Sequence, residues 1–273
     1  MTRWAAFAGI TLAVLSLLLV VARASQAMVT APHGGERSPG SVDGDGHLDA
    51  VEADVRPGED PSPASPTVER DEGSRPSTPA LFANVAISQA LFAGLLVAGI
   101  LLTGVPWSAL GVSADPISSG LPGVAVGIGL GVAVALANAV AAGLADAFGA
   151  DPSRDLRELL APETRRGWLV LLAVVLPLVA GFEELLFRAA LIGGFAAGFG
   201  LSPWLLAVLS SVAFAAGHGA QGGPGVVVTG LLGLALAVAF VLTGSLLVVV
   251  LAHYVVNTVE FVVGEGLGWR PFG

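Results

Sequence analysis

The chain has 273 residues, of which 54% are hydrophobic and 12% are charged, and its mean hydropathy is +0.81. Soluble domains carry about a quarter charged residues, so this composition excludes an ordinary water-soluble domain and indicates a lipid bilayer as the solvent. Acidic residues outnumber basic ones 21 to 12, and the net charge of −9 argues against nucleic acid as a partner. Because the chain contains no cysteine, disulfides, thiolate nucleophiles and cysteine-ligated metals are excluded.

The first apolar run extends from Trp4 to Ala22 and follows Arg3. It is longer than the core of a typical signal peptide, so we expect residues 1–22 to form a transmembrane anchor, with a cleaved signal peptide as the alternative. From residue 23 to residue 79 the sequence is rich in Pro, Gly, Ser, Asp and Glu and poor in large apolar residues. Such a segment cannot bury enough surface to offset its chain entropy, which predicts an acidic, disordered linker.

Residues 41–52 of this linker follow much of the EF-hand loop pattern, but Ser41 stands where the pattern requires Asp. The flanking sequence is rich in Pro and Gly and offers no helix pair to hold such a loop. We therefore interpret residues 41–52 as part of the solvated linker and not as a calcium site.

Beyond the linker, six further apolar segments are long enough to form membrane or core helices. They are Leu81 to Gly104, Leu121 to Ala145, Trp168 to Phe195, Ser202 to Gly217, Val226 to Thr243 and Leu246 to Val263. Together with the first run they predict an all-α fold, a polytopic helical bundle of about seven to eight transmembrane helices. Residues 80–273 would form the membrane domain, and we expect the protein to be a multi-pass protein of the cell membrane.

Ionisable side chains within apolar spans are costly, at least about 2.5–3.5 kcal/mol each, so each one needs a partner or a function. Here they gather in the C-terminal half of the chain, as Glu183, Glu184, Arg188, His218 and His253, with the polar Asn257 one turn after the last.

Helical spacing separates the two glutamates. Glu184 and Arg188 are four residues apart and can form an ion pair on one helix face, which is a sufficient structural explanation for both. Glu183 is turned about 100° from Glu184 and lacks that partner. His253 and Asn257 are also four apart and share a face. A free carboxylate, two histidines and an asparagine on three polar-bearing helices favour a catalytic site over mere helix contacts.

Three motifs occur in chain order within these helices. They are Glu-Glu-x-x-x-Arg at residues 183–188, Phe-x-x-x-His at 214–218 and His-x-x-x-Asn at 253–257. With them the chain resembles the CPBP family of intramembrane glutamic endopeptidases, which includes the type II CAAX prenyl proteases and the abortive-infection-like proteins. The resemblance covers residues 167–264.

This resemblance implies an endopeptidase in which Glu183 is the general base that activates water and His218 assists it. It implies further that His253 and Asn257 stabilise the oxyanion, while Glu184 and Arg188 support the arrangement. No cofactor is implied, and the partners would be the lipid bilayer and a membrane-associated protein or peptide substrate.

Other functions remain open from the residues alone. Two histidines and one glutamate also make a hydrolytic zinc shell, so a zinc-dependent intramembrane metalloprotease is one alternative. A transporter would carry internal repeats, and none is evident. A non-catalytic scaffold is the third alternative. We expect Glu260, near the end of its helix, to lie outside the site.

Overall fold

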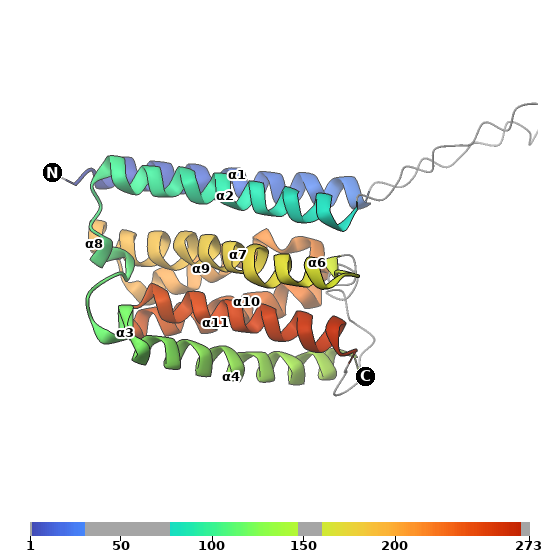
Figure 1. Ribbon diagram of the computed structural model, residues 1–273. Coiled ribbons are helices and arrows are strands. Elements are labelled where there is room, and N and C mark those ends of the chain that lie inside the picture. The colour runs from blue at the N-terminus through green and yellow to red at the C-terminus, as the bar shows by residue number, and fades with distance from the viewer. Residues whose placement is uncertain (1, 31–76, 147–159, 269–273) are drawn as a thin grey trace, which may run out of the picture. The chain divides into compact units, whose positions relative to one another are not determined.

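A computed structural model describes residues 2–30, 77–146 and 160–268 of the chain. Met1–Val29 and Pro76–Gly273 form one compact unit, and the elements below belong to it. Within the described residues every regular element is a helix, and six helices are long and apolar enough to cross a membrane (Figure 1). The predicted all-α polytopic membrane bundle is confirmed. The segment at residues 41–52 lies outside the described residues.

The helices α1 (Trp4–Thr30) and α2 (Thr78–Thr103) lie side by side (Figure 1). A Cβ at Gly99 of α2 would stand 2.7 Å from the Ile10 side chain, so this glycine allows α1 to approach closely. Helix α1 continues past Ala22, where the anchor was predicted to end. Most of the predicted linker falls outside the described residues.

The helix α4 (Leu121–Asp146) packs along the helix α11 (Leu246–Phe261). It is preceded by a 3-10 turn, η1 (Trp107–Leu110), and a short helix, α3 (Pro116–Ser119). A Cβ at Gly127 would lie 2.8 Å from the Leu251 Cβ and 2.9 Å from the Val248 carbonyl oxygen. Only glycine permits this approach, so α4 fixes the position of α11 by backbone contact.

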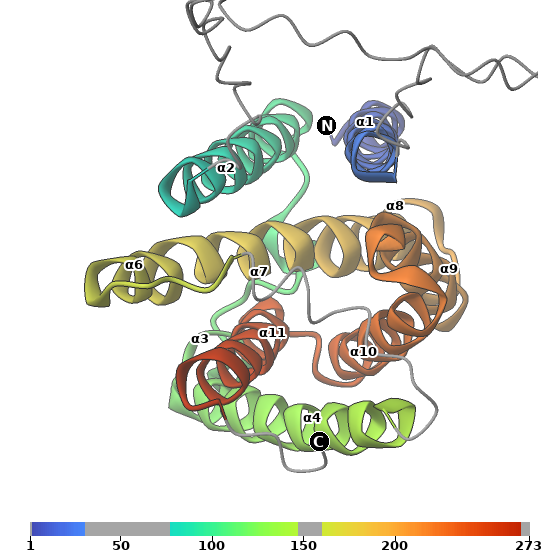
Figure 2. The same ribbon diagram turned by 90° about the vertical axis from the view of Figure 1, so that its right-hand side faces the viewer.

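The longest apolar helix runs from Arg165 to Phe199 and contains two π-helical stretches. Its parts are α6 (Arg165–Val170), η2 (Leu171–Val175), α7 (Leu176–Glu184), η3 (Leu185–Gly194) and α8 (Phe195–Phe199). The first π stretch ends just before Pro177, whose missing N–H disturbs the regular ladder. Figure 2 shows α7 between the α1–α2 pair and the helices α4, α10 and α11.

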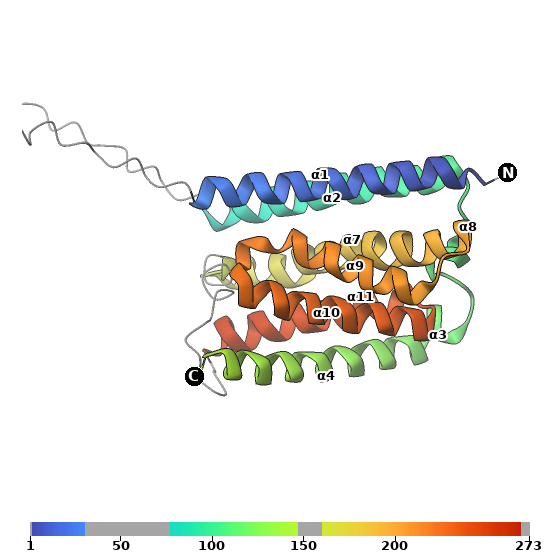
Figure 3. The same cartoon turned by 180° about the vertical axis from the view of Figure 1, so that it is seen from behind.

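The C-terminal part of the chain adds three helices, which are seen from behind in Figure 3. They are α9 (Pro203–Gly217), α10 (Gly222–Thr243) and α11, with the turns η4 (Gly219–Gln221) and η5 (Val262–Gly266). Helix α9 is the predicted span that falls below membrane length: its 15 residues rise about 22 Å, against a hydrocarbon core of about 30 Å. A helix this short can end within the bundle, which is where His218 follows it.

A buried apolar cluster joins α1, α2, α7, η3 and α9. Its aromatic members Phe7, Phe182, Phe187 and Phe214 are each at most 1% exposed. Phe182 directly precedes Glu183, and Phe187 directly precedes Arg188 within the motif. The polar residues are therefore held in a close-packed apolar surrounding, in which unpaired charges are costly.

Candidate active site

The helix α7 and the π stretch η3 that follows it place the Glu-Glu-x-x-x-Arg residues on different sides of one helix. Glu184 and Arg188 are fully buried, and the Arg188 Nη1 donates to the Glu184 Oε1 at 2.8 Å. Glu183 is turned away from this pair, and its side chain is 12% exposed. The geometry therefore contains the ion pair expected from the four-residue spacing and leaves Glu183 outside it.

Arg188 has two further contacts that connect η3 to neighbouring helices. Its Nη2 donates to the Gly233 carbonyl oxygen of α10 at 2.9 Å, and its guanidinium lies 4.7 Å from the centre of the Phe214 ring of α9. The sequence could not predict the hydrogen bond to Gly233, because every residue has a backbone carbonyl that can accept. Arg188 thus joins three helices around one buried charge.

Glu184 also contacts the last helix, a contact that sequence reasoning missed. The His253 Nδ1 lies 2.7 Å from the same Glu184 Oε1 that accepts from Arg188. Because a carboxylate accepts, His253 donates from Nδ1 and its Nε2 points elsewhere. Two residues 69 positions apart meet here, which helical spacing alone cannot show. Glu184 therefore orients the imidazole ring as well as pairing with Arg188.

Glu183 faces the Nε2 atoms of both histidines. The distance is 4.0 Å from its Oε1 to the His218 Nε2 and 3.7 Å from its Oε2 to the His253 Nε2. Both distances exceed a direct hydrogen bond, so neither histidine is paired directly with the Glu183 carboxylate in this geometry. Three helices, α7, α9 and α11, thus converge on the Glu183 carboxylate.

The tautomer of His218 follows from its own backbone contact. The His218 Nδ1 lies 2.8 Å from the Phe214 carbonyl oxygen, one helical turn earlier. A carbonyl oxygen only accepts, so Nδ1 carries the hydrogen and the neutral ring presents its Nε2 lone pair toward Glu183. The Phe214 ring, 4.6 Å from the His218 ring, supports the same orientation.

Asn257 follows His253 by one turn of α11 and is half-buried. Within the described residues its side chain makes no hydrogen bond, so the amide is available to a ligand. Glu260, three residues further, accepts at Oε1 from the Asn138 Nδ2 of α4 at 3.1 Å. Its polar contact is therefore with α4 and not with the histidines.

No group of three or more His, Asp or Glu side chains in the described part of the chain is arranged to hold a metal ion. In the observed geometry both histidine Nδ1 atoms are engaged by protein oxygens, while their Nε2 atoms face Glu183. This arrangement directs two ring nitrogens, from two helices, at one carboxylate.

Comparison with known proteins identifies the segment that carries this site. Residues 165–259 match the family described as type II CAAX prenyl endopeptidase Rce1-like. No curated protein and no solved structure gives a significant match to the chain. The matched segment begins at α6, ends within α11, and contains Glu183, Glu184, Arg188, the two site histidines and Asn257. Residues 165–259, which carry the whole candidate site, are therefore similar to the Rce1-like family of type II CAAX prenyl endopeptidases.

Proposed function

We propose that this multi-pass membrane protein hydrolyses a peptide bond of a membrane-associated protein or peptide, with Glu183 as the general base. The observation that carries the proposal is the position of the Glu183 carboxylate, within 4.0 Å of the Nε2 atoms of two histidines from two other helices. A carboxylate so placed, in an apolar surrounding and outside the Glu184–Arg188 pair, is suited to accept a proton from water.

The water is positioned by two acceptors in this scheme. It donates one hydrogen to the Glu183 Oε1 and the other to the lone pair on the His218 Nε2, so that its oxygen lone pair is free to attack. As the oxygen bonds to the carbonyl carbon, Glu183 takes up one proton. That proton then passes to the leaving nitrogen as the carbon–nitrogen bond breaks, which restores the carboxylate.

The developing oxyanion is stabilised from α11. His253, with its Nδ1–H held by Glu184, donates from Nε2 when both ring nitrogens are protonated, and the Asn257 amide donates from one turn further along. One oriented donor contributes about 3 kcal/mol to the transition state. Glu184 is a positioning residue here: it accepts from the His253 Nδ1–H and orients the ring, and Arg188 keeps that carboxylate in place.

The family suggests a prenylated CAAX protein, and other membrane-anchored or signal-type peptides fit the same chemistry. We further propose that the protein acts in the cell membrane.

Comparative peptidomics tests the proposal. Cells expressing the wild-type chain and cells expressing Glu183→Gln at equal membrane levels would be compared for peptide termini. Peptide termini that form only with the wild-type chain support the proposed protease activity and identify its substrate. Identical termini in both would contradict Glu183 as the base, and a cellular effect that survives the substitution would favour a scaffold.

A further inference from the structure

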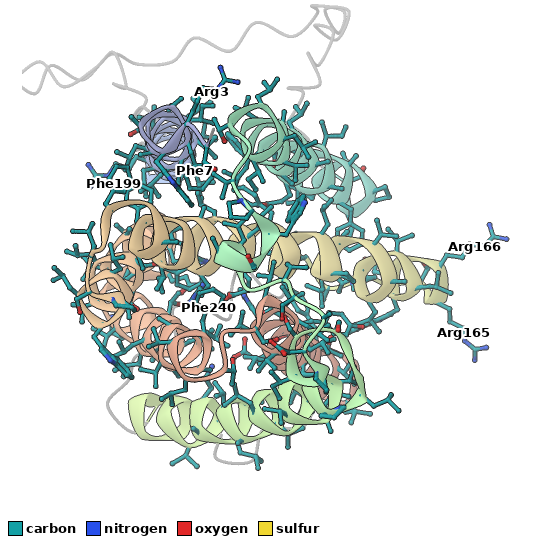
Figure 4. All side chains as sticks on the ribbon, turned by 90° about the vertical axis from the view of Figure 1, so that its left-hand side faces the viewer. Arg3, Phe7, Arg165, Arg166, Phe199 and Phe240 are labelled. Carbon is teal, nitrogen blue, oxygen red and sulfur yellow. The ribbon has the colours of Figure 1, made fainter. Side chains whose placement is uncertain are left out.

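Glu260 is an ionisable residue of the last span that the proposed reaction does not use. It is half-buried in α11 and has one polar partner among the described residues, the Asn138 amide of α4 at 3.1 Å. No arginine of the described part of the chain pairs with it. Arg165 and Arg166 point outward from the bundle (Figure 4). Glu260 is therefore a carboxylate in an apolar helix with only a neutral partner.

The position of Glu260 along α11 relates it to the proposed active site. His253, Asn257 and Glu260 are spaced by four and three residues, so they lie within about 60° of one another on a single stripe of the helix. At about 1.5 Å per residue, Glu260 lies roughly 10 Å along the helix axis from His253. This distance equals about three residues of an extended peptide at about 3.3 Å each.

A contact between α4 and α11 does not by itself account for a charge at this position. Hydrogen bonds between membrane helices contribute on average about 0.6 kcal/mol. An acidic side chain within a membrane helix is costly, and although this cost is lower near the end of a helix, a neutral amide does not neutralise the charge. Glutamine would make the same amide contact without the charge. The carboxylate therefore carries a charge that no cation of the described residues neutralises.

We propose that Glu260, oriented by Asn138, forms a subsite for a basic side chain of the substrate, lysine or arginine, about three residues from the cleaved bond. This subsite rests on the proposed protease function and specifies which peptides the site accepts. The substrate would lie extended along the stripe of α11, with its carbonyl at His253 and Asn257 and its cation at Glu260. An ionic hydrogen bond in this apolar setting supplies the specificity.

The test uses the purified full-length chain in lipid nanodiscs and a proteome-derived peptide library. We expect wild-type cleavage sites to be enriched in Lys or Arg at one position two to four residues from the cut. Two synthetic peptides that differ only by Lys or Gln at that position then give a ratio of kcat/KM. We expect a wild-type ratio of about ten or more, and a ratio near one for Glu260→Gln.

Glu265→Gln is the matched control, since it removes the same charge at the same end of the chain but off the stripe of His253. We expect it to keep the wild-type ratio. The glutamine in Glu260→Gln retains an oxygen acceptor for Asn138, so we expect that variant to remain folded. The ratio of kcat/KM for the two peptides does not depend on the amount of active protein.

The outcomes separate the subsite from the proposed function. Wild-type cleavage with no basic preference, or a preference that Glu260→Gln retains, overturns the subsite and leaves the protease in place. If Glu265→Gln also abolishes the preference for a basic residue, the subsite is overturned as well, because negative charge at this end of the chain would then be the cause and not Glu260 itself. Absence of any wild-type cleavage overturns both proposals.

Discussion

The buried pair of Glu184 and Arg188 leads to a prediction about stability that single and double substitutions resolve. Arg188→Met keeps most of the side-chain volume but removes the cation beside a fully buried carboxylate. Breaking a buried pair by removing one partner typically destabilises by about 3–5 kcal/mol, because the other charge stays uncompensated. We expect a loss in the free energy of unfolding of that size.

The double variant Glu184→Gln with Arg188→Met should recover part of this loss. The glutamine oxygen can still accept from the His253 Nδ1, and no buried charge remains. The Gly233 carbonyl oxygen loses its donor in both variants, so its penalty of about 1–3 kcal/mol cancels in the comparison. The double variant should therefore be more stable than Arg188→Met by about 2 kcal/mol.

Unfolding by sodium dodecyl sulfate in dodecyl maltoside micelles, followed by tryptophan fluorescence, measures these differences. The cleavage rate of the double variant should stay low although its fold is restored, because a neutral amide oxygen accepts from the His253 Nδ1–H more weakly than a carboxylate does. A double variant no more stable than Arg188→Met would refute the assignment of Glu184 and Arg188 as a buried charge pair that supports the site.

Four further predictions follow from individual contacts. Asn257→Ala should lower kcat about 10²–10³-fold with little change in KM, as measured by steady-state kinetics, if its amide acts on the oxyanion. Gly127→Ala should destabilise by about 1–3 kcal/mol in thermal unfolding because it overpacks α4 against α11, whereas Gly129→Ala, with nothing within 4 Å of its Cβ, should not. Cleavage should persist after exhaustive chelation; loss of activity restored only by zinc would favour the metalloprotease alternative. Because Phe7 of α1 is fully buried against the bundle, the intact mass of purified protein should include α1, and a mass lacking it would identify a cleaved signal peptide.

Sequence alone predicted the features of this molecule that depend on local pattern. Apolar runs of membrane length located the helices, because the bilayer demands continuous helical hydrogen bonding across about 20 residues. The spacing of Glu184 and Arg188 predicted their pairing, because a helix brings residues four apart onto one face. The three motifs lie within the segment, residues 165–259, that is similar to the Rce1-like family.

The features that the sequence did not predict depend on contacts between distant segments. Two hydrogen bonds depend on how the helices α7, α10 and α11 pack. His253 donates to Glu184, and Arg188 donates to the Gly233 carbonyl oxygen. The Asn138 contact with Glu260 likewise crosses 122 positions of the chain. Hydrophobic periodicity fixes which face of a helix is buried but not which residue of another helix it meets.

The most direct test of the central claim is the rate of peptide-bond hydrolysis by purified protein in nanodiscs, with wild type and Glu183→Gln compared on a substrate found by peptidomics. Run in H₂¹⁸O, the wild-type reaction should place one ¹⁸O atom in the new carboxyl terminus, and Glu183→Gln should slow it by at least about 10² if the carboxylate is the general base. Equal rates for the two proteins would contradict the role proposed for Glu183.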